Sequence, residues 1–70
     1  MSPEARVLWG ALRRLRRWMS AQALGLACGR SELAAIQWAV RTVAPLVDRG
    51  MVTARIYPDC GRCMFRATDI

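Results

Sequence analysis

Cys60 and Cys63 form a Cys-x-x-Cys pair, the spacing found in zinc sites and in thiol–disulfide enzymes. A structural zinc site needs four ligands, and the chain has one further cysteine, Cys28, and no histidine. One chain therefore cannot complete such a site unless Asp59 or a second chain contributes. A redox pair normally precedes a helix, whereas this pair lies among turn residues. We expect no metal and no cofactor, with Cys60 in a turn and Cys63 half-buried.

Acid–base and nucleophilic chemistry has little support in the sequence. There is no histidine, and the two glutamates and three aspartates are scattered along the chain. No carboxylate pair, catalytic triad or glycine-rich phosphate loop is present. We therefore expect a protein that is not an enzyme and has no small-molecule substrate.

The charge balance is the strongest chemical signal. The chain has eleven basic residues, all arginine, against five acidic ones, and its formal net charge is +6. A compact basic domain attracts polyanions through long-range electrostatics. Nucleic acid is the common target of such a domain. Binding of RNA or of an anionic membrane surface is a weaker alternative to binding of DNA. The arginines between Leu12 and Trp18 form either a solvated helix face or a phosphate-contacting one.

Length and hydropathy limit the size and location of the protein. Its 70 residues predict one domain, near the lower limit for folding without disulfides or metals. The hydrophobic fraction of 54% indicates either a dense core or apolar surface kept for a partner, which leaves a homodimer open. No run of eighteen apolar residues predicts a membrane span, and the N-terminal charges run opposite to a secretory signal. Together with the odd number of cysteines, this favours a cytoplasmic protein.

Capping residues predict two helices in the first half of the chain. Ser2 and the proline after it are typical of a helix start, and an apolar stripe continues to Trp18. The first helix is therefore expected over about residues 3–18. Ser20 is expected to cap a second helix over about 21–27, which Gly25 weakens by roughly 1 kcal/mol relative to alanine.

A third, longer helix is expected over about residues 32–49, between the capping residue Ser31 and a stop at Gly50. Pro45 removes a backbone donor, so we expect a kink or break just before it. Five aliphatic residues share one face of this helix and are expected to pack into the core. They are Leu33, Ile36, Val40, Val43 and Val47.

Trp38 falls on the opposite side of this helix. Either the first helix or a second copy of the chain covers it, or it contacts a ligand such as the sugar-phosphate backbone of DNA.

After Gly50 the pattern has a period of two, as in a strand with one covered face. Turn residues follow Tyr57, and a second alternating segment then runs to Ala67. This predicts a β-hairpin over about residues 51–67. Ile56 and Phe65 are expected to point inward, and three arginines outward. These arginines are Arg55, Arg62 and Arg66.

A short helix, a glycine turn, a long helix and a basic hairpin resemble the winged helix-turn-helix family. The resemblance rests on SAQAL (20–24), LVDRGMV (46–52) and RCMFRATD (62–69). It implies an α+β fold over residues 1–70, namely a three-helix winged helix-turn-helix with a C-terminal two-stranded β-hairpin wing. The family commonly places its recognition helix in the major groove and its wing over the neighbouring minor groove or backbone. The expected function is therefore binding of double-stranded DNA, as in a small transcriptional regulator.

The resemblance also implies roles for particular residues. The helix start at Ser31 is suited to hold a phosphate, Gln37 to pair with adenine, and Arg41 with guanine or phosphate. The wing arginines would contact the backbone. The expected DNA-binding residues are Arg30, Ser31, Gln37, Trp38, Arg41, Arg55, Arg62 and Arg66. The alternative is a winged helix that binds another protein through the surface around Trp38.

Overall fold

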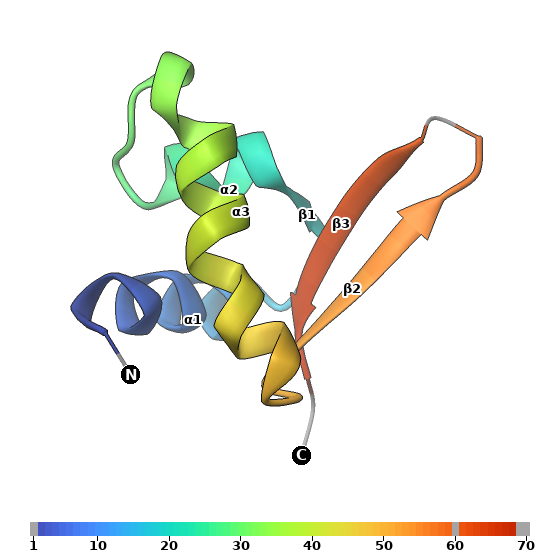
Figure 1. Cartoon of the computed structure of the whole chain (residues 1–70), viewed down its shortest axis with the longest axis horizontal. Coiled ribbons are helices and arrows are strands. Elements are labelled where there is room, and N and C mark those ends of the chain that lie inside the picture. The colour runs from blue at the N-terminus through green and yellow to red at the C-terminus, as the bar shows by residue number, and fades with distance from the viewer. Residues whose placement is uncertain (1, 60, 69–70) are drawn as a thin grey trace.

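The chain folds as three helices and a three-stranded antiparallel sheet, in the order α1–β1–α2–α3–β2–β3 (Figure 1). The computed structural model describes residues 2–59 and 61–68. The helices are α1 (Pro3–Leu15), α2 (Ala21–Ala27) and α3 (Glu32–Asp48). The strands are β1 (Met19–Ser20), β2 (Val52–Tyr57) and β3 (Arg62–Ala67). The fold class is thus α+β, and this order of elements is compatible with a winged-helix layout.

The first two helices begin at the serines that the sequence indicates. The Ala5 N–H donates to Ser2 Oγ at 3.1 Å, and the Ala23 N–H donates to Ser20 Oγ at 3.2 Å. The side chain of Ser31 makes no such bond, so the expected cap of α3 is absent.

The expected end of α1 at residue 18 is wrong. Arg16 adopts the left-handed conformation, with φ 51° and ψ 40°, and its N–H donates to the Leu12 carbonyl at 3.0 Å. This geometry closes the helix after Leu15 and turns the chain toward β1.

The expected hairpin is confirmed as β2 and β3, but the sheet has the strand order β1–β3–β2, and the sequence did not predict β1. In β1, Met19 pairs with Phe65 and Ser20 pairs with Met64. In the hairpin, the register runs from Val52 opposite Ala67 to Tyr57 opposite Arg62. Its outer half projects beyond the helices (Figure 1).

The inward face of α3 is not the one that the sequence predicts. Leu33 is 97% exposed, and Ile36 and Val40 are 50% and 49% exposed. Val43 is buried as predicted, and Val47 is half-buried against the core. The rest of the buried face is shifted from the predicted one and comprises Ala35, Ala39, Thr42 and Leu46.

A close crossing between α2 and α3 explains this choice. A Cβ atom placed on Gly25 would lie 2.6 Å from the Cα and 2.7 Å from the Cβ of Ala35. Two residues with little or no side chain therefore bring the helices together more closely than Leu33 or Ile36 would permit. The helix also continues through Pro45, so the expected break is absent.

The core lies where the three helices meet the inner part of the sheet. Every strand and helix contributes to it, because β1 brings Met19, β2 brings Val52 and β3 brings Phe65. The largest fully buried side chains are Leu8, Leu12, Leu24, Val43 and Leu46. No helix among the described residues combines the length and hydropathy needed to span a membrane.

Candidate nucleic-acid interface

Gln37 and Arg41 form the outward face of α3. Both are exposed, and they lie one turn apart on the same side of the helix. At about 100° per residue, this side is opposite the buried Ala39. The amide and the guanidinium are therefore presented together to solvent.

Arg30 and Trp38 form a separate pair at the side of α3. The Arg30 guanidinium carbon lies 4.5 Å from the centroid of the Trp38 indole, which is within cation–π range. Trp38 is half-buried and packs against the core, and its Nε1 is buried without an acceptor. Arg30 thus covers a face of the ring, and only part of Trp38 reaches the surface.

Arg55 and Arg66 lie on the sheet face that points away from the core. Side chains alternate along β2 and β3, so the buried Phe65 places Arg66 and the opposite residue Thr53 on the outer face. Arg55 lies two residues after Thr53 and therefore shares this face. The Arg55 guanidinium lies 5.5 Å from the Tyr57 ring centroid, and Trp18 meets Tyr57 edge-on with centroids 6.4 Å apart. The side chain of Arg62 lies outside the described part of the chain.

The expected DNA-binding residues thus occupy three surfaces. Gln37 and Arg41 lie on the outward face of α3, and Arg30 and Trp38 lie at its side. Arg55 and Arg66 lie on the outer face of the sheet. Ser31 is exposed at the start of α3, next to the Arg30 pair.

An aliphatic stripe on α3, formed by Leu33, Ile36 and Val40, is exposed beside its polar face. Ile56 shares the inward face of the hairpin with Phe65, as expected, but it is 70% exposed because the hairpin tip extends beyond the helices. A shallow groove of about 320 Å³ runs along this stripe to β3. It is lined by Ser20, Ala21, Gln22, Ile36, Val40 and Cys63.

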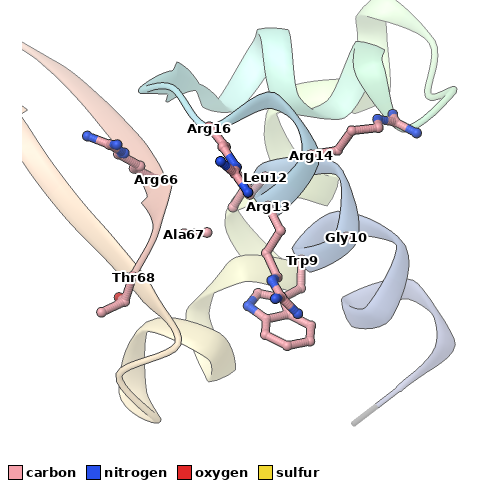
Figure 2. A pocket seen from close by; sticks show the side chains of 9 residues that line it. All are labelled: Trp9, Gly10, Leu12, Arg13, Arg14, Arg16, Arg66, Ala67 and Thr68. Atoms are coloured by element: carbon pink, nitrogen blue, oxygen red, sulfur yellow. The ribbon is translucent and has the colours of Figure 1, made fainter. Parts of the chain in front are cut away.

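A larger cleft of about 790 Å³ opens between α1 and β3 (Figure 2). The Arg13 guanidinium carbon lies 4.7 Å from the centroid of the Trp9 ring at one end, and Arg16 lies between α1 and β3. The lining residues are Trp9, Gly10, Leu12, Arg13, Arg14, Arg16, Arg66, Ala67 and Thr68. The run of arginines from Arg13 to Arg17 was the available sequence signal, but its position beside residues 66–68 depends on the tertiary fold.

The described cysteines, Cys28 and Cys63, are free thiols. Cys63 is exposed rather than half-buried, and Cys60 lies outside the described residues. Burial raises the pKa of the Cys28 thiol, and the charges of Arg30 and Arg14 offset part of that rise. No group of three or more metal-ligating side chains comes together within the described ranges.

Comparison with known proteins assigns no family. A scan against protein-family models finds no match, and no curated protein matches the sequence. The functional argument therefore depends on the geometry and charge of the chain itself.

Proposed function

We propose that this chain is a winged-helix protein that binds double-stranded DNA, with α3 at the major groove and the hairpin against the backbone. The observation that carries the proposal is the element order α1–β1–α2–α3–β2–β3 with sheet order β1–β3–β2, in a chain of net charge +6. A helix exposed on one side and followed by a projecting hairpin is suited to this mode of docking. Transcription regulation is the biological role that the family resemblance suggests.

The outward face of α3 supplies the proposed base contacts. Arg41 can bond guanine or a phosphate, and Gln37 can bond adenine. The neighbouring aliphatic stripe has no hydrogen-bonding groups, but Ile36 and Val40 can touch thymine methyl groups. This surface would read few bases, so most of the affinity would come from phosphates.

The molecule is 33 Å in its longest dimension, about the 34 Å length of one turn of B-DNA. One molecule would therefore cover roughly ten base pairs. Arg55 on the outer face of the hairpin would add a backbone contact that positions the protein without reading sequence.

Fluorescence anisotropy with a labelled 20-base-pair duplex at several salt concentrations tests this proposal. Affinity should fall with salt, with a log–log slope of about −0.9 for each phosphate contact. Arg41→Ala and Arg55→Ala should each weaken binding and reduce the slope by about 1.

Arg6→Ala is the matched control, because Arg6 is an exposed arginine on α1 outside the proposed interface. It removes the same charge and should have a smaller effect. Equal losses in all three variants, or binding that does not respond to salt, would contradict the proposed interface.

Protein contact is a second candidate, and the exposure of Leu33, Ile36 and Val40 favours it. The contact surface would be this aliphatic stripe and not the surface around Trp38. A second copy of the chain is the partner we propose, since a two-fold axis across α3 would pair each stripe with its own equivalent. Such a dimer would cover the side of α3 next to Gln37.

A further inference from the structure

The outer face of the sheet carries two aromatic rings, those of Trp18 and Tyr57, that do not pack against the core. We propose that this face binds single-stranded nucleic acid, with unpaired bases stacked on these rings and the backbone held by arginines beside them. The inference goes beyond the duplex binding proposed above and does not rest on it, because it requires no residue of α3.

Trp18 and Tyr57 meet across the central strand of the sheet. Phe65 on β3 is buried, so Arg55, which lies opposite its neighbour Met64, is on the outer face. Tyr57 follows Arg55 by two residues and shares that face. Trp18 directly precedes β1, on the other side of β3, and its ring meets the Tyr57 ring with centroids 6.4 Å apart and planes at 87°. The two rings thus come from the two edges of the sheet.

The Trp18 ring has a face that no other ring occupies. Both Trp18 and Tyr57 are half-buried, and neither is among the described side chains that pack against the core. A perpendicular contact occupies at most one face of the indole, and Tyr57 is its only ring partner within residues 2–59 and 61–68. Every base has a π-face, so an unpaired base can stack on such a ring whatever its sequence.

The charge of the outer face suits a nucleic-acid backbone. The face is built by residues 16–20, 52–57 and 61–67, and these segments contain no aspartate or glutamate. Arg16 and Arg17 directly precede the tryptophan, and both are exposed. Guanidinium groups bond phosphate oxygens in pairs, so the phosphates next to a stacked base have partners close by.

Arg55 links this charge to the rings. Its guanidinium carbon lies 5.5 Å from the centroid of the Tyr57 ring, within cation–π range, and the residue is exposed. A nucleotide on this face would gain a stacking contact and a charge-assisted hydrogen bond from neighbouring side chains. Positive groups interleaved with aromatic rings are the combination that single-strand binding sites use.

Unpaired bases fit these rings better than a duplex does. The bases of a duplex stack on one another, so a protein ring that lies against its backbone has no base face to contact. Docking of the hairpin on a duplex therefore gives Arg55 a role but gives none to Trp18 or Tyr57. Sheet faces with aromatic residues are a known way of holding two or three unpaired bases.

Fluorescence anisotropy with labelled ten-nucleotide oligomers tests the inference. The probes are a thymidine decamer, a uridine decamer and an abasic oligomer of the same length and charge. The tighter-binding decamer should bind at least about tenfold more tightly than the abasic oligomer, because it has bases to stack. That decamer also identifies the preferred sugar. If the abasic oligomer binds as tightly as both decamers, the backbone alone explains the binding and the inference is wrong.

Substitution of Trp18 locates the contact. Trp18→Ala should weaken decamer binding about tenfold, and Trp18→Phe should keep most of it, because phenylalanine retains a ring. Trp9→Ala is the matched control, since Trp9 is also half-buried and lies beside an arginine, but on α1. Equal losses in all three variants would contradict the proposed site. The abasic comparison uses the unmodified chain, so it decides the inference even if a variant does not fold.

Arg41→Ala separates this inference from the duplex proposal. It should weaken duplex binding and leave decamer binding unchanged, whereas Trp18→Ala should do the reverse. Failure of the chain to bind either decamer overturns the inference and leaves the duplex proposal standing. Decamer binding without duplex binding overturns only the function proposed above.

Discussion

Arg16 ends α1 in a conformation that glycine adopts more easily. Arg16→Gly should raise the free energy of unfolding by about 1 kcal/mol, because it relieves the positive φ of a residue with a Cβ atom. Urea unfolding followed by circular dichroism measures this as a higher midpoint with an unchanged slope. A lower midpoint would mean that contacts of the Arg16 side chain stabilise the fold by more than its backbone costs.

The exposure of Trp38 depends on its neighbour Arg30. Its position opposite the aliphatic stripe left open whether the protein covers the ring or a ligand does. In the structure Arg30 stacks on the ring, and Trp38 also packs against the core. The Trp38 Nε1–H is buried and has no acceptor within the protein.

At the scale of elements, the crossing of α2 over α3 depends on Gly25. Gly25→Ala should destabilise the protein by about 1–3 kcal/mol, because the new Cβ would overlap the backbone of Ala35. This range is the net change, after the gain of about 1 kcal/mol that alanine gives in a helix. Thermal and urea unfolding measure the change.

Gly10→Ala is the control for that substitution. Gly10 lies within α1 and has no atom within 4 Å of an added Cβ, so alanine should stabilise the protein by up to about 1 kcal/mol. If both substitutions change stability in the same direction, the close crossing at Ala35 does not limit the packing of α2.

Elements with local signals could be predicted from the sequence. Ser20 caps α2, and turn residues between Tyr57 and Gly61 connect the hairpin, so both were expected where the structure has them. β1 has two residues and no periodicity, and it exists because Met19 meets Phe65. Such pairing is a property of the tertiary fold and leaves no local pattern.

The face of α3 could not be chosen from periodicity, because both candidate faces are apolar. The stripe at Leu33 has larger side chains, which favoured it as the core face. That choice is wrong for Leu33 because the close approach of α2 at Gly25 requires the small side chain of Ala35 in the core. The candidate functional surfaces were also only partly predictable from the sequence. The exposure of Gln37 and Arg41 followed from their positions on one helix. The cleft lined by arginines could not be predicted, because it joins residues 9–16 with residues 66–68.

At the scale of the whole molecule, the exposed stripe on α3 predicts self-association. Leu33→Lys should shift the protein toward monomer, because it places a charge on an apolar contact and removes no core side chain. Sedimentation equilibrium over a range of concentrations measures the shift. Val7→Lys, at an apolar residue on α1 that is 54% exposed, should leave the association unchanged. A wild-type chain that stays monomeric at all concentrations would contradict the dimer.

The pairing of Met19 with Phe65 also has a consequence for synthesis on the ribosome. The three helices are complete by Asp48, but the central strand of the sheet ends only at Ala67. A nascent chain that has emerged as far as the helices therefore exposes Met19 and the helix surfaces that the sheet later covers. Closure of the sheet must wait for β3, so it is a late event in the vectorial folding of this chain.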